Sequence, residues 1–252
     1  MKNYFFLLLI GFLLVSCSTD EEKAEEAAEK AKEELNAGDT SAALVYLKEA
    51  TELDPKNEGY LSEKILIHYY LGEYENVIEG CSALIESGNS SAGIWNVLGI
   101  SYSANGEPKN AIDAFTEAIE LNPNKYNFWH NRALERKVIR DYEGAMNDYT
   151  KAIELNPKAD KTWNRRGNLH YILNNYSSAI YDFSKAIELK PTYAIYFENR
   201  ADAKLLNGDQ EGACADARVA ERLGEDIDIS EYCQMTGLIE IPPGVTPIKI
   251  FN

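Results

Sequence analysis

Histidine, cysteine and acidic side chains are what an enzyme or a metal site would be built from, and their spacing in this chain supports neither. The three histidines are His68, His130 and His170, and His130 has no cysteine or histidine companion at a metal-ligand spacing. We find no glycine-rich phosphate loop and no serine–histidine–aspartate arrangement that spacing can support. The sequence therefore predicts a protein that is not an enzyme and holds no metal or cofactor.

The excess of acidic residues argues against some classes of binding partner. The chain has 25 lysines and arginines against 41 aspartates and glutamates, a net charge of −16. Nucleic-acid binding needs basic patches that replace counterions, so a nucleic-acid partner is not expected. Adhesion to an anionic lipid surface is disfavoured for the same reason. The acidity either serves solubility or indicates a preference for basic partners.

A 34-residue repeat predicts the helices that would position any binding residue. Aromatic, small and proline residues recur at fixed places, most clearly in residues 92–125 with Trp95, Leu98, Gly99, Tyr102, Ala111, Phe115, Ala118 and Pro123. The same frame gives Trp129, Ala133, Ala145, Tyr149, Ala152 and Pro157 in 126–159, and Trp163, Gly167, Ala179, Phe183, Ala186 and Pro191 in 160–193. This pattern predicts two antiparallel helices per unit, with small residues where their backbones approach most closely.

These copies resemble the tetratricopeptide repeat (TPR) family, whose pattern has small residues at positions 8, 20 and 27 and proline at 32. Weaker copies without insertions extend the frame, so that six units are expected at 24–57, 58–91, 92–125, 126–159, 160–193 and 194–227. The resemblance implies an all-α fold, a right-handed α-solenoid of stacked helix hairpins. Residues 228–252 are expected to form a short capping helix, around 228–236, and a proline-rich tail that covers apolar surface.

The N-terminus predicts export and lipidation. Lys2 precedes an apolar run from Tyr4 to Val15 that is too short to span a bilayer, which indicates a signal peptide at 1–16. The sequence Leu14-Val15-Ser16-Cys17 resembles the bacterial lipobox, which implies acylation of Cys17, as by palmitate. Ser18 directly after the cysteine is similar to lipoproteins sent to the outer membrane, and the acidic residues that follow resemble a surface-export signal, so the protein is expected to face the periplasm or the cell surface. Residues 17–23 are expected to be a short acidic tether. The alternative is an ordinary signal peptide with a cysteine near its cleavage site.

Charged residues recur within the repeat frame as well. Position 7 is arginine and position 23 is aspartate in the last three units, which pairs Arg132 with Asp148, Arg166 with Asp182 and Arg200 with Asp216. In residues 92–125 both positions are apolar, Leu98 and Ala114, so the two positions change together within one chain. We therefore predict structural ion pairs within or between hairpins.

The remaining cysteines are expected to be structural. Cys81 stands where other units have an aromatic residue, which indicates a small buried residue. Cys214 occupies an inward-facing position of its helix, and Cys233 follows nineteen residues later. An oxidising envelope would permit a Cys214–Cys233 disulfide that holds the capping segment, and two reduced core thiols are the alternative.

The TPR resemblance implies that the first helices line a concave groove for peptides. The residues expected there are Asn96, His130, Asn131, Leu134, Lys161, Asn164, Arg165, Asn168 and Tyr171. Lys161 and Arg165 reverse the overall charge locally. Together with Asn131 they match three of the five positions of the carboxylate clamp of chaperone-binding TPR domains, whereas Asn96 and Ile100 depart from it. Ordinary surface polarity is the alternative.

The predicted function is that of a lipid-anchored scaffold for protein–protein interaction in a bacterial envelope, with a protein or peptide partner bound in the groove. Two alternatives stay open. One is a structural or assembly factor without a specific groove ligand. The other is a glycan-binding outer-membrane lipoprotein, for which Tyr69, Tyr70 and Tyr171 are the stacking candidates, although the chain lacks the long insertions that build sugar sites in such proteins.

Overall fold

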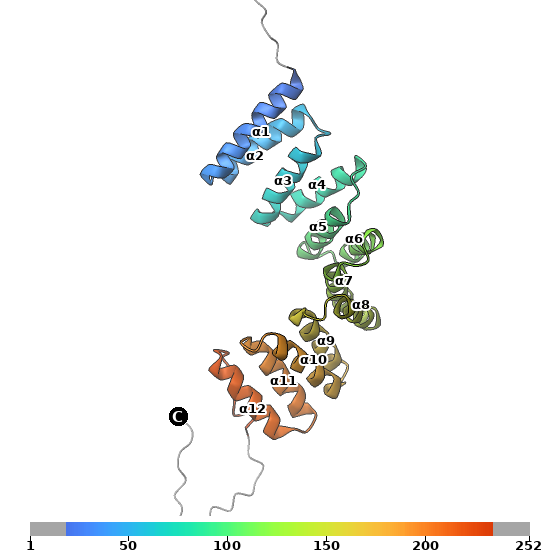
Figure 1. The fold of residues 1–252 in the computed structure, drawn as a ribbon, viewed down its shortest axis with the longest axis vertical. Coiled ribbons are helices and arrows are strands. Elements are labelled where there is room, and N and C mark those ends of the chain that lie inside the picture. Colours follow the sequence, from blue (N-terminus) through green and yellow to red (C-terminus); the bar gives the residue numbers. More distant parts are fainter. Residues whose placement is uncertain (1–18, 234–252) are drawn as a thin grey trace, which may run out of the picture. The chain divides into compact units, whose positions relative to one another are not determined.

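The computed structural model describes residues 19–233, which form twelve α-helices and no strand (Figure 1). The predicted signal peptide, the acylation site Cys17 and the proline-rich tail lie outside these residues. The helices are α1 (Asp20–Ala37), α2 (Thr40–Leu53), α3 (Glu58–Leu71), α4 (Tyr74–Glu86), α5 (Ala92–Ala104), α6 (Pro108–Leu121), α7 (Tyr126–Val138), α8 (Tyr142–Leu155), α9 (Asp160–Ile172), α10 (Tyr176–Leu189), α11 (Ala194–Leu206) and α12 (Gln210–Arg222).

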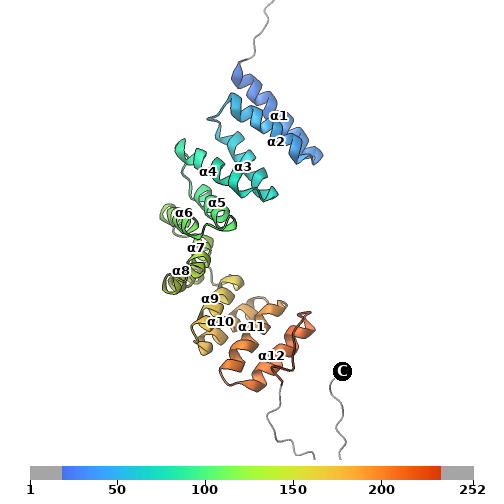
Figure 2. The same cartoon turned by 180° about the vertical axis from the view of Figure 1, so that it is seen from behind.

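The helices pack as consecutive pairs, which is the arrangement of a TPR solenoid. The chain divides into two compact units after Gly106, so that the first unit holds α1–α5 and the second holds α6–α12. In the first unit α1 packs on α2 and α3 on α4, and in the second unit α7 packs on α8, α9 on α10 and α11 on α12. Each hairpin also contacts the next one in its unit: α8 packs on α9, and α10 packs on α11 (Figures 1 and 2). The predicted all-α repeat fold is therefore confirmed.

Small residues allow the two helices of a hairpin to approach closely. In the pair α9–α10, a β-carbon on Gly167 would lie 2.7 Å from Cε1 of Phe183, a distance that real β-carbons do not tolerate. In the pair α7–α8 the same positions hold Ala133 and Tyr149, both fully buried. In these two hairpins position 8 must therefore be small, because the aromatic side chain from position 24 fills the space beside it.

Each hairpin turns through one residue in the left-handed conformation. Glycine takes this place between α5 and α6 and between α11 and α12, whereas Arg140 (φ 64°) and Asn174 (φ 60°) take it between α7 and α8 and between α9 and α10. A non-glycine residue is strained in this conformation, and asparagine tolerates it better than arginine.

The ends of the repeat array differ from the prediction. The acidic tether was expected to run to residue 23, but α1 begins at Asp20. The reason is a capping box: the hydroxyl of Thr19 accepts a hydrogen bond from the backbone of Glu22, whose side chain accepts one from the backbone of Thr19. The acidic first turn also complements the helix dipole, so these residues favour helix over an extended tether.

The predicted capping helix is wrong in the part that the structure describes. Residues 229–232 form a single turn, in which the backbone N–H of Cys233 donates to the carbonyl of Ile229 at 2.9 Å. Side-chain contacts hold this segment instead of helical pairing. Tyr232 is buried against Ala213 and Ala217 of α12, and its hydroxyl donates to Asp202 of α11 at 2.5 Å. A buried tyrosine can close the apolar end of a hairpin without a further helix.

Candidate partner-binding surface

The predicted binding residues of the second unit lie on α7 and α9. We call the outward positions of these two helices and of α11, the next first helix, the first-helix face. Polar contacts join these helices. Nδ1 of His130 on α7 lies 3.0 Å from the hydroxyl of Thr162 on α9. The amide nitrogen of Asn199 on α11 donates to Oδ1 of Asn164 on α9 at 2.8 Å. Residues more than thirty positions apart thus meet on one surface.

Two cations stand exposed on this face. Lys161 and Arg165 of α9 are both open to solvent, and within residues 19–233 neither makes a hydrogen bond or an ion pair. Lys137 of α7 is a third cation close by, because burial first and then the charge of Arg165 lower the pKa of its amine. Like charges that lie close together repel one another. An anion supplied by a partner would relieve that repulsion.

His130 lies beneath these cations and is neutral at pH 7. Burial first, and then the charges of Arg165 and Lys161, lower the pKa of its imidazole from 6.5 to about 4. The ring meets Tyr149 of α8 edge-on, with centroids 5.8 Å apart. His130 is therefore a packed, uncharged residue of this face and does not add to its positive charge.

The hydroxyl of Tyr149 is a buried polar group that sequence reasoning missed. Its side chain is fully buried, and its hydroxyl has no hydrogen-bond partner within the described part of the chain. Burial raises the pKa of this phenol, whereas the charge of Arg165 lowers it. A buried hydroxyl without a partner costs about 1–3 kcal/mol. The repeat frame had assigned Tyr149 to aromatic packing, because the repeat pattern accepts phenylalanine at that position equally well.

The other predicted residues of this surface are buried or half-buried and pack within the fold. Leu134 packs beside Tyr149 in the core of α7 and α8, and Asn164 is buried. Asn131, Asn168 and Tyr171 are half-buried, and Tyr171 rests against the cluster formed by Ala179, Phe183 and Ala203. Asn96 lies on α5 in the first unit and is described apart from this face. Lys161 and Arg165 are thus the fully exposed members of the predicted set within the second unit.

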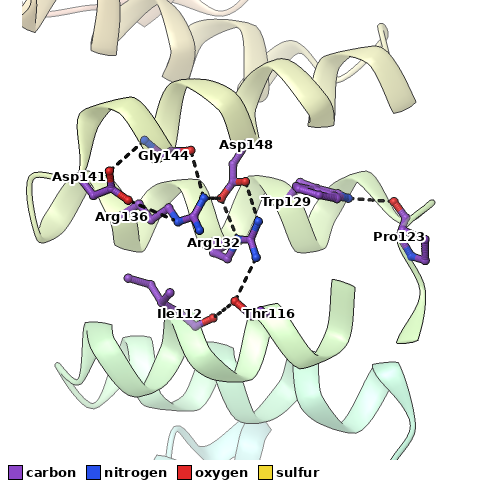
Figure 3. A network of polar contacts seen from close by, with 9 residues as sticks. All are labelled: Ile112, Thr116, Pro123, Trp129, Arg132, Arg136, Asp141, Gly144 and Asp148. Atoms are coloured by element: carbon purple, nitrogen blue, oxygen red, sulfur yellow. Dashed lines mark hydrogen bonds and ion pairs between the residues drawn. The ribbon is translucent and has the colours of Figure 1, made fainter. Parts of the chain in front are cut away.

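The predicted arginine–aspartate pairs form a polar ladder through the second unit, and Figure 3 shows the first pair, Arg132 with Asp148. Arg132 donates to both carboxylate oxygens of Asp148, at 2.9 and 2.8 Å, and its third contact is the hydroxyl of Thr116 in the preceding repeat, at 3.0 Å. Arg136 donates to the same carboxylate at 2.9 Å. The guanidinium of Arg132 also lies 5.0 Å from the ring centre of Trp129. The ladder therefore ties each hairpin to the one before it.

The same contacts recur in the next two repeats. Arg166 bonds to Asp182 and to the hydroxyl of Thr150, and Arg200 bonds to Asp216 and to the hydroxyl of Ser184, at 2.7–3.2 Å. A second basic group approaches each aspartate from position 11: Nε2 of His170 lies 3.9 Å from Asp182, and Nζ of Lys204 lies 2.8 Å from Asp216. Sequence reasoning identified the pairs but missed the hydroxyl and the second basic group. These arginines are engaged in the architecture and leave no free charge for a ligand.

The cysteines form no reactive centre in the described residues. Cys214 and Cys233 are joined by a disulfide with a Cα–Cα distance of 4.7 Å, which fixes the turn after α12 to that helix. Cys81 is a free thiol, but it is buried, and burial raises its pKa to about 11. Only the thiolate is an effective nucleophile, so Cys81 is unreactive at neutral pH.

No group of three or more histidine, cysteine, aspartate or glutamate side chains suited to a metal ion occurs in residues 19–233. None of the helices described for the same residues is long and apolar enough to cross a membrane.

Comparison with protein families identifies the repeats. Sequence profiles of the tetratricopeptide repeat match residues 92–125, 126–159 and 160–193, in the register that the residue pattern predicts. Residues 92–193 are therefore three consecutive TPR units, and the flanking hairpins share their helix pairing. Comparison with curated proteins gives no match.

Solved structures support the same fold. A tetratricopeptide repeat protein from Parabacteroides merdae is 22% identical with a TM-score of 0.65, over 84% of this chain and 97% of that one. The C-terminal part of a TPR repeat-containing protein from Cytophaga hutchinsonii is 15% identical with a TM-score of 0.66, over 77% and 78%. YrrB, described as a TPR protein with an unusual peptide-binding site, is 18% identical with a TM-score of 0.59, over 67% and 87%. At these identities the likeness shows the fold alone.

Proposed function

We propose that this protein is a lipid-anchored TPR scaffold of a bacterial envelope, and that the first-helix face of its second unit binds an acidic segment of a protein partner. TPR folds generally serve protein–protein interaction and are not enzymes. The observation that carries the proposal is the pair of exposed cations, Lys161 and Arg165, which have no hydrogen-bond or ion-pair partner within residues 19–233 of a chain with a net charge of −16.

The charges around this pair favour a carboxylate. Lysine and arginine on successive turns of one helix present charge-assisted donors to one surface, and such bonds are about twice as strong as neutral ones. Lys137 adds a further cation from α7. The hydroxyl of Tyr149, which has no hydrogen-bond partner in the described structure, lies within reach of the charge of Arg165. A partner that brings a carboxylate to this place would therefore gain charge-assisted hydrogen bonds to Lys161 and Arg165, which neither residue makes within residues 19–233.

The envelope location rests on the N-terminal sequence and has one supporting observation from the fold. The disulfide between Cys214 and Cys233 suits an oxidising compartment, where such bonds persist. Labelling cells with an alkyne palmitate analogue tests the anchor. We expect label on the wild-type chain and none on Cys17→Ala, which should also leave the membrane fraction. Equal labelling of both would refute lipidation at Cys17.

The partner is tested by site-specific photo-crosslinking in cells. Probes at Asn127 and Asn168 report on the first-helix face, and a probe at the exposed Glu154 of α8 is the control position. We expect a defined product from the face probes that disappears in the double variant K161E/R165E.

A matched control makes this loss specific. The variant K151E/K158E reverses the charge of two other exposed lysines of the second unit, so it changes the net charge equally. Retention of the product in K151E/K158E is expected. Loss in both variants, or in neither, would contradict recognition through Lys161 and Arg165.

A structural or assembly role without a specific ligand is the second candidate. It is favoured by the engagement of His130, Leu134 and Asn164 in internal contacts, which leaves less of the predicted surface open than the sequence suggested. Under that function, K161E/R165E would fold, reach the membrane and cause no defect in cells.

A further inference from the structure

A hollow in the first unit lies apart from the first-helix face. It runs beside the contact between α3 and α4 and is lined from α3 by Leu61, Lys64, Ile65 and His68, and from α4 by residues that include Glu79 and Gly80. Figure 1 shows these two helices side by side as one hairpin. In the repeat frame, its lining includes the same positions that build the polar ladder of the second unit.

Comparison of the repeats shows what is missing from this hollow. In the last three units, a basic residue at position 7 and another at position 11 converge on the aspartate at position 23, whose side chain is 2–7% exposed. In residues 58–91 the basic residues remain, as Lys64 and His68, but position 23 is Gly80. No other unit keeps both basic groups without the aspartate: residues 92–125 carry Leu98, Tyr102 and Ala114, and residues 24–57 carry Lys30, Glu34 and Tyr46.

The absence of the aspartate is accompanied by a change in packing. Position 8 is Ala133, Gly167 or Ala201 where position 23 is aspartate, but it is Ile65 here. A β-carbon on Gly80 would lie 2.5 Å from Cγ1 of Ile65, so this hairpin excludes any side chain at position 23. The isoleucine therefore leaves no room for an aspartate at position 23, although the basic residues at positions 7 and 11, which bind that aspartate in other repeats, are still present.

Of the two basic residues, Lys64 has no internal anion among the described residues, whereas His68 pairs with a glutamate. Lys64 is half-buried and makes no hydrogen bond or ion pair with any residue that the structure describes. His68 is held in place by its Nδ1, which lies 2.6 Å from a carboxylate oxygen of Glu73. Because Glu73 occupies Nδ1, an external ligand that contacts this ring would have to use the other nitrogen, Nε2. Glu79 is exposed at the rim, and its charge disfavours multiply charged anions more than a single carboxylate.

We propose that this hollow binds one carboxylate group supplied from outside the hairpin, in place of the aspartate that the other repeats carry internally. Lys64 is the charged donor, and the apolar wall of Leu61 and Ile65 receives the carbon atoms next to the carboxylate. The carboxylate comes either from a free small acid or from an acidic side chain or C-terminus of a partner protein. This site does not depend on the function proposed for Lys161 and Arg165.

The test is a titration of the full-length protein in mild detergent, followed by the NMR signals of Lys64, His68 and Gly80. The probes are sodium acetate, N-acetyl-aspartate amide, and two short peptides that differ at one position, which is aspartate in the first and asparagine in the second. Sodium chloride and sodium sulfate at equal ionic strength are the salt controls. We expect saturable shifts with the carboxylates, with dissociation constants on the order of millimolar, and no saturation with either salt.

The variant I65A/G80D rebuilds the pattern of the other repeats and supplies the carboxylate internally, and I65A/G80N is its uncharged match. We expect carboxylate binding to fall at least tenfold in I65A/G80D and to be retained in I65A/G80N. In K64L, which keeps the native packing of Ile65 and Gly80, binding should be lost, so the proposal remains testable if the double variants fail to fold.

The probes also distinguish the two sources of the carboxylate. Tighter binding of the aspartate peptide than of its asparagine counterpart and of acetate indicates a partner's acidic residue, whereas equal binding of acetate and the peptide indicates a free small acid. The proposal is overturned if no carboxylate shifts these signals beyond the salt controls, or if K64L binds as the wild type does.

Discussion

The polar ladder makes a quantitative prediction at the Arg166–Asp182 pair. Asp182 has a side chain only 2% exposed and receives two bonds of 2.8 Å from Arg166. In R166L the remaining basic group is His170, 3.9 Å away. Removing one partner of a buried pair typically costs about 3–5 kcal/mol, because the other charge stays buried without compensation. Burial lowers the pKa of His170, so its ring is largely uncharged at pH 7, and we expect R166L to lose about 3–5 kcal/mol.

Removing both partners should cost much less. The repeat at 92–125 already carries the apolar version, in which Leu98 and Ala114 are 3% and 2% exposed. In R166L/D182A the buried charge disappears together with its partner, and the main losses are the contact of Arg166 with the ring of Trp163, 5.0 Å away, and its bond to Thr150. We expect this double variant to lie within about 1.5 kcal/mol of the wild type, consistent with replacement of buried ion pairs by apolar residues.

The assay is urea unfolding followed by circular dichroism, with amide hydrogen exchange on α9 and α10, because repeat arrays can unfold in parts. D182A is the third corner of the cycle. It should lose less than R166L, since Arg166 is 15% exposed and can turn its charge to water. A double variant less stable than R166L would refute the reasoning, because the pair would then contribute net stability beyond the cost of burying its charges.

Three further predictions follow from single features of the structure. Burial, with the charges of Arg165 and Lys161, lowers the pKa of His130 from 6.5 to about 4, so the unfolded chain binds a proton before the folded chain does, and the fold loses stability as the pH falls through 6.5 towards 4. H130Q should therefore show a flatter dependence of unfolding free energy on pH, by on the order of 2–3 kcal/mol over this range. Reduction, or the variant C214A/C233A, should destabilise the turn after α12 by about 3 kcal/mol, the entropy of a closed loop of this length, as measured by exchange of its amides with and without reductant. Y149F removes a buried hydroxyl without a partner in residues 19–233, so thermal unfolding should show equal or higher stability, by up to about 2 kcal/mol, whereas a clear loss would indicate that the hydroxyl is bonded.

The repeat pattern predicted the fold well because it records local geometry. Helix periodicity, the small residue at Gly167 and the proline that follows four of the six described second helices act within one hairpin, so each copy carries its own evidence. The Arg166–Asp182 pair was also readable, because the chain contains a second version in which both positions are apolar. Repetition inside one sequence thus supplied the comparison that a single helix could not.

The ends of the array were harder to predict, since no neighbouring repeat sets the pattern there. The capping box of Thr19 and Glu22 was present in the sequence but was read as part of a tether. The segment after α12 contains Tyr232, whose role depends on Asp202, thirty residues earlier in the chain. Such a contact has no local signature.

The amino-acid sequence by itself determined the helical hairpins, their register, and the arginine–aspartate pairs, because all of these follow from spacings within one or two repeats. Only the tertiary structure decided which polar groups are satisfied internally and which face solvent. It assigned His130 and Asn164 to contacts between hairpins, left Lys161 and Arg165 exposed without a partner in the described chain, and buried the hydroxyl of Tyr149. The physical reason is that hydrogen bonding and burial depend on side chains brought together from distant repeats, whereas helix formation depends on neighbours along the chain.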